Sequence, residues 1–116
     1  MVAYEDEIEQ ILKEITVSLK KNLPSTVTFN LGQYGITLKK KERVIAIQLF
    51  NTETSIIQNI FGSSKVPFLL TIEDRLTNKK FSKRFLIDDV EDWFEKKKDI
   101  FLSYILDFVR KVRFLD

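Results

Sequence analysis

The carboxylates of residues 88–99 are the first candidates for chemistry, because six of them surround one tryptophan in the segment DDVEDWFEKKKD. Asp88 or Asp89 stands where a helix N-cap is expected, and each has an acid three residues later, as in a capping box. Acids in a first turn face unpaired N–H groups and the positive end of the helix dipole. The segment lacks the spacing of a calcium-binding EF-hand loop. We therefore interpret these acids as a helix start and assign no metal ligand.

Histidine and cysteine are absent from the chain. Zinc sites, thiolate nucleophiles and disulfides cannot be built from its own residues, and the side chain most used for proton transfer near neutral pH is missing. With three glycines, the sequence has neither a Walker A nor a GxGxxG phosphate loop. The sequence thus predicts a protein that is not an enzyme, with no catalytic residue, cofactor or small-molecule ligand. A carboxylate-dependent metal enzyme is the least favoured alternative.

Basic residues gather in the middle of the chain although the net charge is only +2. They form two clusters, which comprise Lys39, Lys40, Lys41, Arg43, Lys80, Lys83 and Arg84. If the strands that hold them are neighbours in a sheet, their charges form one patch that could follow the phosphates of a nucleic acid. The structural alternative is that these residues decorate turns and protect an edge strand from aggregation.

The C-terminal region offers a second kind of surface, because its apolar stripe is wider than one face of a sheet-covering helix needs. Ile100 and Tyr104 lie on one flank of this stripe, and Val109 lies on the other. These flanks need a second covering, which either the first helix or another copy of the chain must supply. Residues 43–50 are also apolar on both faces of a strand, which indicates burial on both sides or a subunit contact. We therefore expect a homodimer.

The elements that position these residues follow from the apolar periodicity. Helices are predicted at residues 4–21, 52–61 and 88–116, and strands at residues 25–31, 34–39, 43–50, 66–72 and 79–87. The element order is αβββαββα. We expect one α+β domain over residues 1–116, with a mostly antiparallel five-stranded sheet and the two long terminal helices on one face. The short helix at 52–61 should cover part of the other face or an edge.

Location and function follow from these elements. There is no apolar run long enough to span a membrane and no signal-peptide pattern, so a cytoplasmic, intracellular protein is expected. Abundant Ile, Lys and Glu without Cys hints at a thermophilic source. The sequence favours a small non-catalytic interaction protein that associates with itself through its C-terminal helix or central strand. The alternative is a nucleic-acid-binding protein that uses the basic patch.

Overall fold

Two long helices form where the sequence repeats apolar residues at helical spacing. The computed structural model describes residues 5–51, 66–87 and 93–116. Helix α1 is Glu5–Asn22, and its buried face consists of Ile8, Ile11, Leu12, Ile15 and Leu19. Helix α3 is Trp93–Lys111, and its buried residues include Phe101, Ile105, Phe108 and Val109. Within the described ranges, no helix has the length and apolar character needed to cross a membrane.

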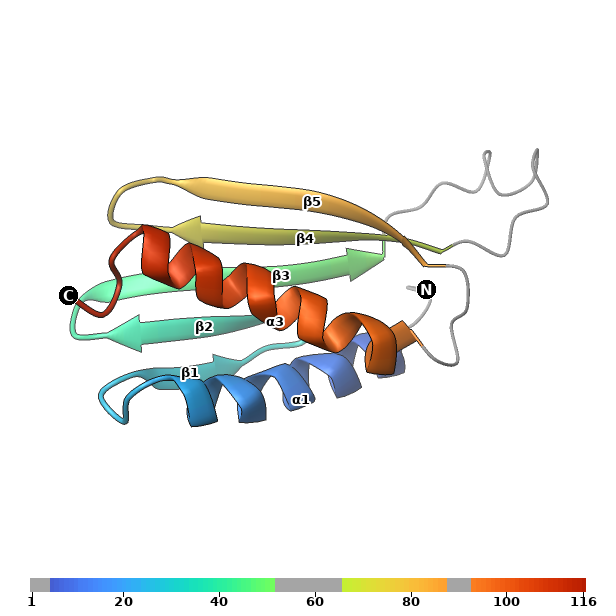
Figure 1. The fold of residues 1–116 in the computed structure, drawn as a ribbon, viewed down its shortest axis with the longest axis horizontal. Helices are drawn as coiled ribbons and strands as arrows, with labels where there is room; N and C mark the ends of the chain where they lie inside the picture. The colour runs from blue at the N-terminus through green and yellow to red at the C-terminus, as the bar shows by residue number, and fades with distance from the viewer. Residues whose placement is uncertain (1–4, 52–65, 88–92) are drawn as a thin grey trace.

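Five strands form a sheet whose spatial order follows the chain. They are β1 (Thr28–Leu31), β2 (Gly35–Lys40), β3 (Arg43–Asn51), β4 (Val66–Asp74) and β5 (Lys80–Ile87). Each strand pairs antiparallel with the next, so β3 is central and β1 and β5 are the edges (Figure 1). Alternate residues of a strand point to opposite faces. In β3, Ile45, Ile47 and Leu49 are therefore buried against the helices.

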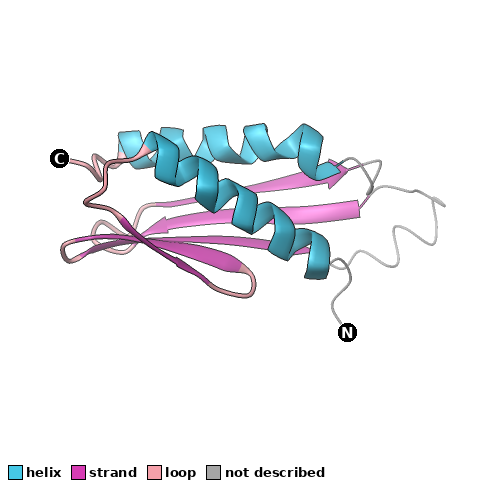
Figure 2. Ribbon diagram, turned by 90° about the horizontal axis from the view of Figure 1, so that it is seen from below, coloured by secondary structure: helices cyan, strands magenta, loops and turns pink. Residues whose placement is uncertain are grey.

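Both helices cover the same face of the sheet, which gives the molecule two layers (Figure 2). Helix α1 contacts β1 and β2, while α3 contacts α1 and β4. The core lies between the layers, where the inward residues of β2, β3 and β4 meet the apolar stripes of the helices. This single domain confirms the predicted α+β class, the five-stranded antiparallel sheet and the placement of both long helices. The short helix predicted for residues 52–61 lies outside the described residues.

The prediction that the last helix runs to the C-terminus is wrong, because α3 ends at Lys111. Arg113 adopts a left-handed conformation with φ 57°. The Phe114 N–H donates to the Val109 carbonyl at 3.1 Å, and the Arg113 N–H donates to the Arg110 carbonyl at 3.1 Å. This pair of bonds is a Schellman motif, which ends a helix and usually has an apolar contact across the turn. Phe114 and Val109, both buried, occupy those two positions.

Arg43 ties the residues after α3 to the sheet. Its guanidinium donates to the carbonyl oxygens of Arg113 and Val112 at 2.6 and 3.0 Å, and to Asp74 Oδ2 at 3.0 Å. The guanidinium carbon also lies 5.6 Å from the centre of the Phe114 ring. Because Asp74 is 0% exposed, the paired cation compensates a charge that would otherwise be costly to bury.

Asp74 remains ionised in this environment. Burial alone would raise the pKa of Asp74, but hydrogen bonds from the Thr77 hydroxyl and the Leu76 N–H, together with the Arg43 charge, lower the pKa below its ordinary value. The bonds from Leu76 and Thr77 also shape the turn between β4 and β5. In the same turn, the Asp74 N–H donates to the Lys79 carbonyl at 2.9 Å. Asp74 thus fixes both this turn and, through Arg43, the end of α3.

Candidate functional site

The face of the sheet opposite the helices is the candidate site, and we call it the open face. No described helix or strand covers it (Figure 2). Its residues alternate with the buried ones along each strand. They are Thr28 and Asn30 of β1, Gly35, Thr37 and Lys39 of β2, Val44, Ala46, Gln48 and Phe50 of β3, Pro67, Leu69, Thr71 and Glu73 of β4, and Lys80, Ser82, Arg84 and Leu86 of β5.

The strand register orders the open face from a polar end to an apolar end. Residues that are opposite one another on neighbouring strands form rows across the face. Two of these rows are mostly polar, and they comprise Thr37, Ala46, Glu73 and Lys80, and Gly35, Gln48, Thr71 and Ser82. Toward the other end, Phe50 is opposite Leu69, and the exposed Leu86 is opposite Pro67, which is buried. The face therefore offers hydrogen-bonding groups over its middle and apolar surface at one end.

Positive charge dominates the described part of the open face. Lys39 lies opposite Val44, and the Arg75 N–H donates to the Val44 carbonyl at 3.0 Å, so Arg75 continues the same row beyond β4. Lys80 and Arg84 add two cations on the edge strand β5. Glu73 is the one carboxylate among the described residues of this face. Four cations against one acid make this face attractive to anions.

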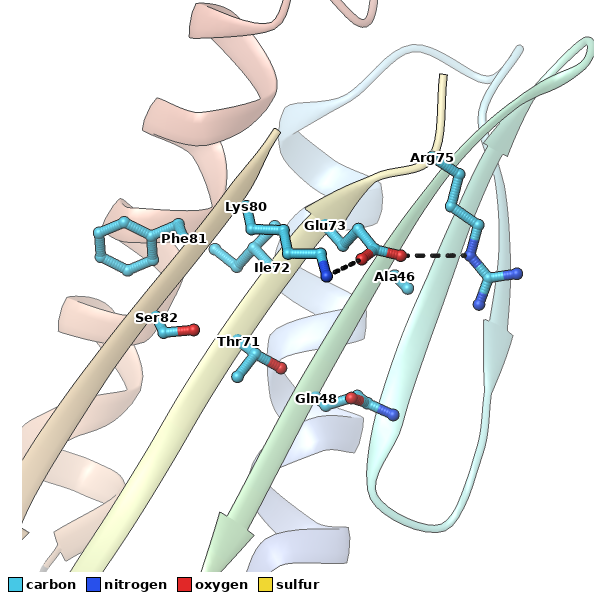
Figure 3. A pocket seen from close by; sticks show the side chains of 9 residues that line it. All are labelled: Ala46, Gln48, Thr71, Ile72, Glu73, Arg75, Lys80, Phe81 and Ser82. Atoms are coloured by element: carbon cyan, nitrogen blue, oxygen red, sulfur yellow. Dashed lines mark ion pairs between the residues drawn. The ribbon is translucent and has the colours of Figure 1, made fainter. Parts of the chain in front are cut away.

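Glu73 joins two of these cations (Figure 3). Its oxygens lie 3.2 Å from Lys80 Nζ and 3.9 Å from Arg75 Nε. Lys80 is directly opposite Glu73 across β4 and β5, a position where opposite charges stabilise a sheet modestly. The Arg75 and Lys80 side chains are mostly exposed, so both ion pairs are weak and leave the two cations in contact with solvent.

Two shallow depressions hollow the open face. One, of about 310 Å³, lies among Gln48, Thr71, Glu73, Lys80 and Ser82 (Figure 3). The other, of about 320 Å³, includes Asn30, Thr37, Tyr34 and Phe50 in its lining. Ala46, Gln48 and Arg75 border both. The hollows arise where side chains are small, because Ala46 presents only a methyl group at the centre of the sheet and Gly35 presents nothing.

The residues predicted to form one basic patch are divided between the two faces. Lys39, Lys80 and Arg84 lie on the open face, and Lys41 lies in the β2–β3 turn with φ 55°. On the helix side, Lys40 Nζ donates to the Leu115 carbonyl and Arg43 binds the segment after α3. Lys83 Nζ lies 5.4 Å from the centre of the Tyr104 ring, also on the helix side.

Sequence reasoning missed Arg75 and the aromatic pair Tyr34 and Phe50. The fourth strand was predicted to end at residue 72, whereas β4 continues through Asp74. Extending the alternation of Leu69, Thr71 and Glu73 by one step would have placed Arg75 on the same face. The aromatic pair has no comparable local signal, because its members are sixteen positions apart and meet only through the pairing of β2 and β3.

Most of the residues predicted for self-association are packed against other residues of the same chain. Val109 is 2% exposed, and Tyr104 stacks on Phe81 with ring centres 5.2 Å apart. Tyr104 also meets the Phe85 ring at 5.9 Å, whereas Ile100 remains 38% exposed. Both edges of the central strand β3 are paired, so this strand could reach another copy only through the open face.

Replacing Tyr104 with alanine should therefore destabilise the fold by about 2 kcal/mol, as expected for truncating a half-buried aromatic side chain that contacts two other rings. Denaturant unfolding measures the loss. Ile100→Ala is the matched control on the exposed side of the same flank, and it should change stability much less. Unchanged stability of the Tyr104 variant, together with dissociation of a wild-type dimer in sedimentation, would favour the self-association surface instead.

Within the described ranges, no group of three or more acids is placed to hold a metal ion. The acids at 88–92 and the side chain of Glu95 lie outside the described residues. On the open face, the chemistry available is hydrogen bonding by amides and hydroxyls beside fixed positive charges. Such groups bind and orient an anionic partner.

The fold and this face together define an α+β protein with a two-layer arrangement and a cationic, hollowed sheet surface. The chain matches no protein-family model, no curated protein and no solved structure. A fold by itself does not determine function, so the assignment has to come from the residues of the open face.

Proposed function

We propose that this chain is a non-catalytic binding protein that takes nucleic acid on its open face. The observation that carries the proposal is the set of four cations, Lys39, Arg75, Lys80 and Arg84, around a polar sheet surface with one acid. Phosphate contacts with lysine and arginine supply most of the affinity of sequence-independent nucleic-acid binding.

The dimensions of the face suit a phosphate backbone. Lys39 and Lys80 are three strands apart, which corresponds to about 14 Å at the usual spacing of neighbouring strands. Several backbone phosphates fit within such a distance. Between the two lysines, Thr37, Gln48 and Thr71 present hydroxyl and amide groups of the kind that bind phosphate and sugar oxygens and fix the position of the strand.

Changing Lys39, Lys80 and Arg84 together to glutamine should weaken binding and reduce its salt dependence. For a single strand, each phosphate that is no longer neutralised by a cation lowers the slope of log affinity against log salt by roughly 0.7, so removing three cations lowers it by roughly 2. Fluorescence anisotropy of a labelled oligonucleotide between about 50 and 200 mM salt measures this slope. Lys80→Gln also removes an exposed ion pair, which should affect stability little.

The matched control is the change of Lys13, Lys20 and Lys21 to glutamine on exposed positions of α1. It removes the same charge from the opposite side of the molecule and should leave the slope nearly unchanged. Equal reductions in both variants would show that only net charge matters and would contradict the open face as the binding surface. Absence of binding by the wild type, combined with a concentration-dependent dimer in sedimentation, would support self-association instead.

A further inference from the structure

Tyr34 and Phe50 form an aromatic contact at one end of the sheet, and phosphate binding does not require such a contact. Tyr34 precedes β2, and Phe50 lies near the end of β3. Their ring centres are 6.1 Å apart and their planes are inclined by 37°. The Leu49 N–H donates to the Tyr34 carbonyl at 2.9 Å, which holds the backbone of Tyr34 against β3. The pair is thus fixed by the central part of the sheet.

Both residues border a hollow, and Tyr34 also packs against the hydrophobic core. Tyr34 and Phe50 are half-buried and line the second depression together with Asn30 and Gln48. An amide side chain can both donate and accept hydrogen bonds, which suits it to the varied edges of nucleobases. The depression therefore combines aromatic surface with adaptable polar groups. Arg75 borders the same depression toward its other end and adds a positive charge there.

We infer that the nucleic acid bound by the open face is single-stranded and that Tyr34 and Phe50 stack its bases. In a duplex the faces of the bases are covered by their neighbours, so only an unpaired base can lie against a protein ring. Stacking on aromatic residues beside a cationic track is the usual way in which single strands are bound without sequence preference. This inference rests on the proposed function, because it names the partner of the same face.

The positions of these cations and of Phe50 also define a path for the bound nucleic-acid strand. Along β3, Val44 in the row of Lys39 and Arg75 is six residues from Phe50, which is about 20 Å in an extended strand. Across the sheet, Phe50 is opposite Leu69 and Leu69 is opposite Arg84, so the backbone of Arg84 lies roughly 10 Å from that of Phe50. A backbone held at the cationic end and at Arg84 can place its bases over the hollows between them.

The test compares single-stranded and double-stranded oligonucleotides of one sequence on the full chain. Wild-type protein should bind the single strand more tightly. Changing Tyr34 and Phe50 together to leucine should lower single-strand affinity about tenfold or more, because each stacked base contributes substantially to binding. Duplex affinity and the slope against salt should stay the same. Phe29→Leu, the same kind of change at a half-buried residue on the helix side of the sheet, is the control and should alter neither.

A second pair of variants distinguishes loss of base stacking from loss of the folded structure. Tyr34→Phe and Phe50→Trp keep an aromatic ring and should retain single-strand affinity within about threefold, while a stacked base should quench the added tryptophan. Equal affinities for both substrates, or a leucine variant that binds single strands as well as wild type, would overturn the inference and leave the charge-dependent binding intact. Failure of the wild type to bind either substrate would instead refute the proposed function itself.

Discussion

Replacing Arg43 with methionine should lower the free energy of unfolding by about 3 kcal/mol or more. The change leaves the Asp74 carboxylate fully buried without its cation, and removing one partner of a buried ion pair has a cost of this size. It also removes the donors to the carbonyl oxygens of Val112 and Arg113, so the segment after α3 loses its connection to β3. Denaturant unfolding followed by circular dichroism measures the effect.

Two further variants separate the buried charge from general loss of an ion pair. Lys13→Met breaks the exposed pair between Lys13 and Glu9, whose atoms are 3.1 Å apart, and should leave stability nearly unchanged. Adding Asp74→Asn to Arg43→Met removes the uncompensated charge. The amide oxygen can still accept from the Leu76 N–H, and the amide N–H can donate to the Thr77 hydroxyl oxygen. The double variant should therefore be more stable than Arg43→Met alone. The Asp74→Asn variant alone completes the comparison. If the double variant loses as much stability as Arg43→Met and Asp74→Asn lose together when measured separately, the two residues are not coupled.

Arg43 also shows where sequence analysis of the site reaches its limit. Its position beside Lys39, Lys40 and Lys41 predicted a surface patch, and its type and spacing were compatible with that role. Its side chain instead turns toward the helices, because alternation along β3 places it on the side of Ile45 and Ile47. The cation it was expected to present to a partner is used by Asp74, which is thirty-one positions away in the chain. A local charge pattern does not contain that pairing.

The fold was easier to predict from the sequence than the site, because the spacing of apolar residues indicates helices and strands directly. The apolar spacing of α1 and the alternation in β3 are local signals, each repeated several times within one element. Because the connections from β1 to β3 are short, antiparallel pairing of neighbouring strands follows almost directly. The end of α3 was missed because the apolar residues Val112 and Phe114 extend the helical stripe, while the turn between them depends on a left-handed Arg113.

The composition of the open face depends on register, which the sequence specifies only through pairs of distant residues. Glu73 faces Lys80, and Gln48 lies between Gly35 and Thr71, because four strands are aligned without slippage. Moving one strand by a single residue would exchange its buried and exposed sets. The buried set of β3 fixes that register, and the partners of Ala46 and Gln48 follow from it. The hollowed centre of the site is thus a consequence of core packing on the other face.

Gly35 lies against the central strand and also lines one of the hollows of the open face. Gly35→Ala should destabilise the protein by about 2 kcal/mol or more. A Cβ atom at this position would lie 2.3 Å from the carbonyl oxygen of Ile47, in the backbone of the central strand. Neither atom can move without shifting β2 relative to β3, and overpacking of this kind is typically destabilising by a few kcal/mol. The unfolding midpoint in denaturant measures the loss.

Gly32→Ala is the matched control, because the same methyl group is added three residues away. There the new Cβ would meet only the Gly35 carbonyl oxygen, at an ordinary 3.6 Å. With no clash, the alanine restricts the unfolded chain and should leave stability unchanged or raise it by about 0.5 kcal/mol. Equal stability of the two variants would contradict the close approach of β2 and β3 at Gly35.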